Sequence, residues 1–218
     1  MEQQSQEQLE QSLEKTTLGH FFNKYSKLIL KVGIGLLVGS FVFTGWYIYQ
    51  QRQNEKSWEN SYDFVQTTLN DYKEKKIDED TLKKQWEDFV QKNKNSSTVL
   101  FTSLEAIKTF QMEGKSSLSL YFLQMVPKPQ KGELHFLWSV NLAALYEDAG
   151  EWQKSLESLS TLKGKESPLM DKVFLDKGRM YQKLGKIAEA KKEYEQVIAS
   201  YPSSEFAKVA RLFLDDLP

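Results

Sequence analysis

Residues that could perform chemistry are sparse in this chain. It has no cysteine and only two histidines, His20 and His135. Without cysteine there is no thiolate nucleophile, no disulfide and no thiolate metal ligand. His135 stands between Glu133 and Trp138 at the start of an expected helix, where packing is favoured over catalysis, and no nucleophile–base motif accompanies it. The sequence therefore predicts no catalytic residue, no metal site and no cofactor, in a protein that is not an enzyme.

The densest group of candidate oxygen ligands for a cation is the Asp-Glu-Asp run at residues 78–80. This run directly precedes a segment of helical periodicity, so we expect the acids to stabilise a helix N-terminus instead. Gly33, Gly35 and Gly39 lie in an apolar run and cannot form a phosphate-binding loop there. The net charge of −1 gives no electrostatic reason to expect a nucleic-acid partner.

An uncharged apolar stretch dominates the N-terminal part of the chain. The 18 residues from Val32 to Tyr49 contain no charge, and counting from Leu28 gives 22 residues. A helix of 18 residues rises about 27 Å, close to the hydrocarbon core of about 30 Å. The stretch ends in Trp and Tyr without a small-residue cleavage site, unlike a signal peptide. We expect an uncleaved transmembrane helix over residues 28–49.

The flanks of this span predict its orientation. Four lysines and no acid lie between Lys15 and Lys31, so residues 1–27 form a polar tail on the cytoplasmic side and the rest is translocated. Gly35 and Gly39 have the Gly-x-x-x-Gly spacing that lets two membrane helices approach closely. Such a contact would join two copies of the chain or dock the span onto a larger membrane complex. Ordinary glycine usage in membrane helices is the alternative.

Residues 50–98 read as an irregular opening helical hairpin. A helix is expected over Gln53–Lys76, with an apolar seam at steps of 4, 3, 4 and 3. That seam consists of Trp58, Tyr62, Val65, Leu69 and Tyr72. The second helix carries Leu82, Trp86, Phe89 and Val90 on one face.

Three later stretches share the same internal spacing. Each has a large residue, a glycine four positions on, a small residue five further, and apolar residues four and then three further. The three sets are Phe110, Gly114, Ser119, Leu123 and Val126; Tyr146, Gly150, Ser155, Leu159 and Leu162; Tyr181, Gly185, Ala190, Tyr194 and Val197. They begin 36 and then 35 residues apart, and Pro127, Pro168 and Pro202 close them. This spacing is typical of the tetratricopeptide repeat, with a period of about 34.

The predicted fold is therefore all-α. A transmembrane helix precedes a tetratricopeptide-repeat-like α-solenoid of about four helix hairpins, in which residues 99–218 hold the repeats and a capping helix that begins after Ser204. In such a solenoid the first helix of each hairpin lines the concave face. The repeat offsets place these residues there: Phe101, Leu104, Lys108, Gln111, Leu137, Val140, Ala144, Glu147, Lys172, Leu175, Arg179 and Gln182. This mixture suits a peptide or a partner helix, although simple packing of several of them is the alternative.

Several of these features occur together in one known family. The basic segment KYSKLILK, the Gly45-Trp46-Tyr47 exit, the helix WENSYDFVQTTL and the closing repeat resemble the single-span, periplasmic tetratricopeptide protein that is an ancillary subunit of the bacterial Sec translocon. The resemblance implies an inner-membrane protein with its C-terminal domain in the periplasm. It also implies translocon subunits and periplasmic chaperones as partners in the handling of secreted proteins. The alternative is a scaffold or assembly factor for another envelope complex, in outer-membrane biogenesis, cell division or secretion.

Overall fold

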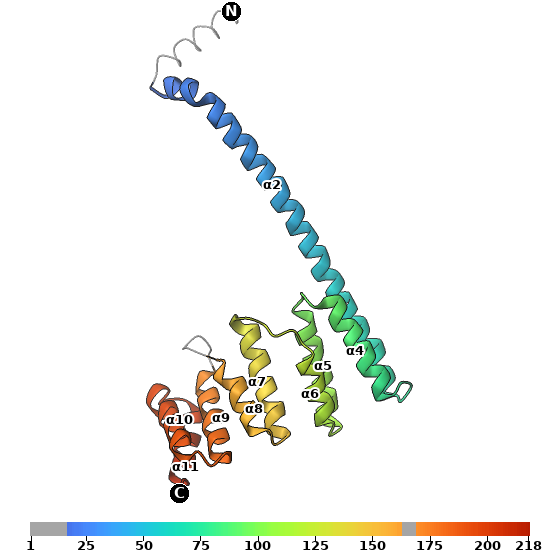
Figure 1. The fold of residues 1–218 in the computed structure, drawn as a ribbon, viewed down its shortest axis with the longest axis vertical. Helices are drawn as coiled ribbons and strands as arrows, with labels where there is room; N and C mark the ends of the chain where they lie inside the picture. Colours follow the sequence, from blue (N-terminus) through green and yellow to red (C-terminus); the bar gives the residue numbers. More distant parts are fainter. Residues whose placement is uncertain (1–16, 163–168) are drawn as a thin grey trace, which may run out of the picture. The chain divides into compact units, whose positions relative to one another are not determined.

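The computed structural model describes residues 17–162 and 169–218, with the side chains of all of these except residues 17–30, 32–35, 37 and 38. Its elements are the α-helices α2 (Thr17–Asp63), α3 (Asn70–Lys73), α4 (Glu79–Asn93), α5 (Thr98–Met112), α6 (Ser116–Gln124), α7 (Gly132–Asp148), α8 (Trp152–Ser160), α9 (Met170–Lys183), α10 (Ile187–Ser200) and α11 (Glu205–Asp215), and the π-helical segment η1 (Phe64–Leu69). Every regular element in these residues is helical, which confirms the all-α prediction (Figure 1).

The chain divides into two compact units, residues 1–56 and 57–218. α2 runs through the boundary, so the first soluble helix continues the segment predicted to span the membrane. Residues 1–16 of the predicted polar tail and Pro168 lie outside the described residues.

The predicted apolar seam of the first soluble helix is wrong before residue 64. Trp58 and Tyr62 are 51% and 66% exposed. The buried side chains are instead Ser57, Ser61, Phe64, Leu69 and Tyr72. Their spacing jumps by five residues across η1, where the hydrogen bonds run from i to i+5. A π turn holds one residue more than an α turn. The buried positions before η1 therefore lie one residue earlier in the sequence than a continuous α-helix would place them.

Hydroxyl groups replace apolar contacts where α2 meets α5. Ser57 Oγ lies 2.5 Å from Thr98 Oγ1, and Ser61 Oγ lies 2.6 Å from Thr102 Oγ1. The Thr102 hydroxyl donates to the carbonyl oxygen of Thr98 at 2.7 Å, so the Ser61 hydroxyl donates to Thr102. All four side chains are buried. Their hydrogen bonds offset the cost of burying them, and their small size lets the two helices pack closely.

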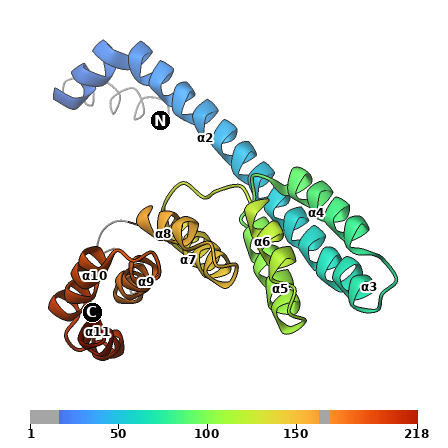
Figure 2. The ribbon, with the colours of Figure 1, turned by 60° about the horizontal axis from the view of Figure 1, so that its bottom comes forward.

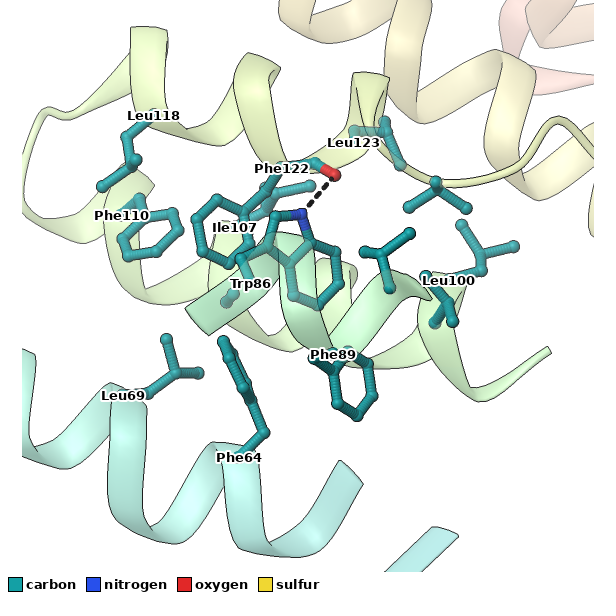
Figure 3. Close-up of a cluster of buried hydrophobic side chains, with 14 of the residues drawn as sticks. Phe64, Leu69, Trp86, Phe89, Leu100, Ile107, Phe110, Leu118, Phe122 and Leu123 are labelled. Carbon is teal, nitrogen blue, oxygen red and sulfur yellow. Dashed lines mark hydrogen bonds between the residues drawn. The ribbon is translucent and has the colours of Figure 1, made fainter. Parts of the chain in front are cut away.

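The core of the opening part is organised around Trp86 of α4. Figure 3 shows its indole ring among side chains from η1, α5 and α6, with the Nε1–H donating to the Phe122 carbonyl oxygen at 3.2 Å. The ring stacks on Phe122, with centroids 4.6 Å apart, and on Phe89, at 5.4 Å. Phe64 of η1 adds a tilted contact at 5.4 Å. The irregular first hairpin and the first repeat therefore share one apolar core.

The acidic run at residues 78–80 serves the start of α4, as the sequence predicts. The Asp78 carboxylate accepts a hydrogen bond from the Thr81 N–H at 2.9 Å. Hydrogen bonding from the Thr81 side chain, and then from its backbone N–H, favours the charged form and lowers the pKa of Asp78 below its usual value. Asp78 is thus the N-cap of α4.

The predicted repeat positions are confirmed. The helix pairs α5–α6, α7–α8 and α9–α10 follow one another, and α6 packs on α7, α8 on α9 and α10 on α11 (Figure 2). Gly114, Gly150 and Gly185 turn each pair with φ of 71°, 74° and 71°, a region that favours glycine. The small residues Ser119, Ser155 and Ala190 are buried between the paired helices. α11 closes the array, and Ser204 caps it by accepting from the Phe206 N–H at 3.0 Å.

Candidate protein-binding surface

The α5 residues predicted to face a partner lie at spacings of three, four and three. Phe101, Lys108 and Gln111 are exposed, and Leu104 is half-buried against the core around Trp86. The Phe101 ring is 39% exposed and stacks on Trp58, with centroids 5.9 Å apart and planes inclined by 24°. This helix therefore presents an aromatic end and a polar end to solvent.

The α7 residues divide between packing and exposure. Leu137 packs partly against the core around Trp86, and Val140 packs partly against a second cluster that contains Leu159 and Val173. Ala144 is exposed, and Glu147 is half-buried. These four positions of α7 are thus more apolar than the four of α5.

The predicted residues of α9 are mostly engaged within the chain. Leu175 is only 5% exposed and packs in the cluster around Tyr194, so it belongs to the core and offers little surface to a partner. Arg179 pairs with Glu147 of α7 and donates to Asp176 at 3.2 Å, and Lys172 pairs with Asp176. The Arg179–Glu147 pair ties α9 to α7, the two pairs with Asp176 lie within α9, and together they leave little uncompensated charge on this part of the surface.

Gln182, the last predicted residue of α9, binds the repeat's own aromatic side chain. The Tyr194 hydroxyl donates to Gln182 Oε1 at 2.9 Å, and the Tyr194 ring is buried against Phe213 of α11, with centroids 5.7 Å apart. Burial raises the pKa of Tyr194 to about 12, while the charge of nearby Arg179 acts in the opposite direction.

This pKa predicts a loss of stability at high pH. An unfolded tyrosine titrates near pH 10. The stability that the folded state gains from the neutral Tyr194 phenol is therefore fully present below a pH of about 10, and it is lost as the pH rises through about 12. We expect the melting temperature of the wild type to fall over this window and that of Tyr194→Phe to fall less steeply. Thermal melts followed by circular dichroism measure both slopes. Equal slopes would contradict the assignment to Tyr194, because Tyr121, whose pKa is also raised, is present in both proteins.

A groove of about 700 Å³ brings together two of the predicted residues, Phe101 and Leu137. Its remaining lining comes from the ends of α7, α8 and α9 and the turn before α7, at Gln130, Lys131, Gly132, Glu133, Leu134, His135, Phe136, Thr161, Leu162, Leu169 and Met170. The repeat offsets did not select these residues, because the offsets describe positions along the first helix of each pair and not the turns that join the helices. The apolar residues Leu134 and Phe136, in the first turns of α7, were the available signal.

The membrane-helix contact at Gly35 and Gly39 stays a prediction. Gly35 lies outside the residues whose side chains are described. A Cβ placed on Gly39 would meet no atom within 4 Å. Large apolar side chains around it are exposed, namely Leu36, Phe41, Val42, Phe43, Trp46, Tyr47, Ile48 and Tyr49. Within the part of the chain that the structure describes, no helix combines the length and the apolar character needed to cross a membrane.

The His135 side chain is engaged in packing and in a backbone hydrogen bond. His135 Nδ1 donates to the Pro129 carbonyl oxygen at 2.9 Å, and its ring stacks on Trp138. Among the described residues, no group of three or more histidine and carboxylate side chains is placed to hold a metal ion.

Comparison with known proteins agrees with the repeat architecture. A family model described as a tetratricopeptide repeat-like domain matches residues 19–218. The match includes α2 from near its start, the irregular opening hairpin and all three repeats. No curated protein matches the chain.

Proposed function

Because the chain belongs to the tetratricopeptide repeat-like domain family, we propose that it is a membrane-anchored module that binds other proteins. The observation that carries this proposal is the surface formed by α5 and α7. Phe101, Lys108, Gln111 and Ala144 are all exposed on the first helices of consecutive pairs. Stacked repeats use such a continuous face for extended protein contacts.

The exposed apolar side chains of α2 support the membrane anchor. From Phe41 to Phe43 and from Trp46 to Tyr49, every residue is exposed, and both runs are apolar or aromatic. These seven positions lie within nine consecutive residues and sample all sides of a helix, so they cannot all be covered by one packing face. A soluble protein rarely leaves an apolar surface of this extent in water, whereas lipid would cover it. Lysines before the span fit an N-terminus in the cytoplasm, and aromatic residues after it fit a membrane interface.

We further propose an inner-membrane protein whose repeats lie in the periplasm and contact translocon subunits and periplasmic chaperones. This finer proposal rests on the resemblance of the KYSKLILK segment, the Gly45-Trp46-Tyr47 exit and the closing repeat to the translocon's ancillary subunit. A helix that leads from the span into the repeat domain without a linker also supports it. Partners within or just outside the membrane would then be the ones within reach.

Photocrosslinking in whole cells tests this function. A benzoylphenylalanine would replace Lys108 or Ala144 in the full chain, and Lys192, an exposed residue on the second helix of the last pair, would serve as the control. We expect carbonate-washed membranes to retain the chain, and the first two positions to crosslink to translocon subunits or periplasmic chaperones.

Two outcomes would contradict the proposal. Equal crosslinking from Lys192 would show that the captured proteins do not recognise the α5–α7 surface. Release of the chain from membranes by carbonate would contradict the membrane anchor. Capture of cytoplasmic proteins alone would contradict the proposed topology.

A further inference from the structure

The hydroxyl contacts between α2 and α5 give these two helices a common direction. Ser57 of α2 contacts Thr98 of α5. Four residues further along both helices, Ser61 contacts Thr102. The two helices therefore run parallel, and the chain that precedes Thr98 leaves this contact in the same direction as the chain that precedes Ser57. On α2, that direction leads back to the predicted membrane span.

The connection between the predicted span and this contact is short. Tyr49, the last residue of the predicted span, precedes Ser57 by eight positions within α2. Eight helical residues rise about 12 Å, and the headgroup layer extends about 5–7 Å beyond the hydrocarbon on each side of a bilayer. Residues 94–97, the turn before α5, precede Thr98. With the span in a bilayer, this turn would lie nearer to the headgroups than Ser57 does.

The turns before α5 and α7 are both basic. Residues 94–97 and 125–131 contain Lys94, Lys128 and Lys131 and no acidic residue. All three lysines are exposed, and none of them forms an ion pair within the described residues. The two turns lie at one end of the repeat array, opposite the glycine turns (Figure 1). This end therefore carries positive charge from two successive turns.

The opposite end of the array has most of its turn lysines balanced by acids. Lys115, in the first glycine turn, pairs with Glu113 at 2.6 Å. Lys154, just after the second glycine turn, pairs with Glu151. In the third glycine turn Lys186 forms no ion pair with a described residue. Uncompensated positive charge in the repeat turns is thus concentrated at the end where α5 and α7 begin.

From these observations we infer that this end of the array rests on the membrane surface, with Lys94, Lys128 and Lys131 among the headgroups of anionic phospholipids. Basic clusters next to a membrane span are attracted to such headgroups. Three lysines would bind a bilayer weakly from solution, but an anchor in the same chain raises their effective concentration at the surface. This inference rests on the proposed membrane anchor and adds a second, lipid-dependent contact, which would hold the array in one orientation beside the bilayer.

Energy transfer from the repeat array to the bilayer tests the inference on the full chain. Since the chain has no cysteine, Gln130→Cys provides a single dye site in the turn before α7. Met112→Cys, at a 75% exposed residue at the other end of α5, provides the control site. Each labelled chain is placed in nanodiscs that carry acceptor dyes on the lipid headgroups. The nanodiscs contain phosphatidylcholine alone or a mixture of phosphatidylcholine and phosphatidylglycerol.

We expect phosphatidylglycerol to raise the rate of transfer from position 130 at least about twofold, with a smaller change at position 112. Salt at about 1 M, where the Debye length is about 3 Å, should abolish the increase. The triple charge reversal Lys94→Glu, Lys128→Glu and Lys131→Glu should abolish it as well, because anionic headgroups would then repel the two turns.

A second variant avoids any loss of packing at Lys128. The Lys128 ammonium lies over the Trp138 ring, 5.6 Å from its centroid, so the triple reversal also removes a cation–π contact. Lys94→Glu with Lys131→Glu leaves this contact intact, and we expect it to remove most of the increase. Far-UV circular dichroism shows whether each variant is folded.

A charge-matched control reverses three exposed lysines elsewhere and should retain the increase. Its substitutions are Lys73→Glu, Lys84→Glu and Lys186→Glu. Equal transfer in the two kinds of nanodisc would overturn the inference, as would an increase that survives high salt or both reversals at the basic turns. An equal loss in the charge-matched control would also overturn it, since net charge alone would then explain the effect.

The same experiment separates this inference from the proposed function. A chain that stays embedded in the nanodiscs but shows equal transfer with both lipid compositions would reject the surface contact and leave the anchor in place. A chain that does not remain in the nanodiscs would reject the membrane anchor, and with it the contact that depends on the anchor.

Discussion

Replacing Trp86 by alanine is expected to lower the free energy of unfolding by about 3–5 kcal/mol, the range for removing a large buried aromatic side chain. The Trp86 ring is fully buried and contacts Phe64, Phe89 and Phe122 within 5.4 Å between centroids. Its loss would leave a cavity in the core that η1, α4, α5 and α6 share, and the Phe122 carbonyl oxygen would lose its indole donor. Urea unfolding followed by far-UV circular dichroism measures the change.

Trp58→Ala is the matched control, because it removes the same side chain from a half-exposed position with one ring contact, to Phe101. We expect it to cost no more than about 1 kcal/mol. Trp86→Phe retains a ring for stacking but lacks the N–H donor, so it should fall between the two. Equal effects of Trp58→Ala and Trp86→Ala would refute the central position of Trp86 in the core.

The repeat framework was predictable because its requirements are local. A turn with positive φ demands glycine, and Gly114, Gly150 and Gly185 meet that demand at one offset from the preceding aromatic residue. Two helices of a pair approach closely only over a small side chain, which Ser119, Ser155 and Ala190 supply. Spacing alone therefore predicted these helix pairs and their turns.

The opening helix was not predictable in the same way because its buried face depends on distant residues. Ser57 and Ser61 are buried since Thr98 and Thr102, 41 positions further along the chain, supply hydroxyl partners. A pattern of apolar residues gives no weight to such pairs and selected Trp58 and Tyr62 instead. The π turn of η1 adds a register change that the order of apolar and polar residues in Phe64–Leu69 does not reveal.

The candidate site was predicted in outline only. Phe101, Lys108 and Ala144, which the repeat offsets assign to the concave face, are exposed on the first helices, and their role in binding a partner stays a prediction. The repeat offsets assign Leu175 to the same face. In the structure, however, Leu175 is buried in a core that α9 forms with α10 and α11. The groove also depends on connecting turns, whose lengths and side chains vary from repeat to repeat and carry no periodic signal.

Replacing Gly178 of α9 by alanine is the second substitution for which we expect a large change in stability, because the helix packs directly on a tyrosine ring at this position. A Cβ built on Gly178 would lie 2.6 Å from Tyr194 Cδ1 and 3.0 Å from Tyr194 Cζ. The ring cannot easily withdraw, since it packs on Phe213 and its hydroxyl is held by Gln182. Glycine in a helix interior is normally about 1 kcal/mol less favourable than alanine. Here we expect the reverse, with Gly178→Ala destabilising the protein by about 1–3 kcal/mol through overpacking.

A double-mutant cycle separates overpacking from helix propensity. In a Tyr194→Leu background the ring is absent, so Gly178→Ala should become neutral or stabilising, with a coupling of about 0.5–3 kcal/mol between the two sites. Urea unfolding of the four proteins gives this value, and a more stable Gly178→Ala in the presence of Tyr194 would contradict the close packing. The next residue, Arg179, pairs with Glu147 of α7. Displacing α9 from α10 would therefore also disturb this ion pair, which joins two repeats on the candidate surface.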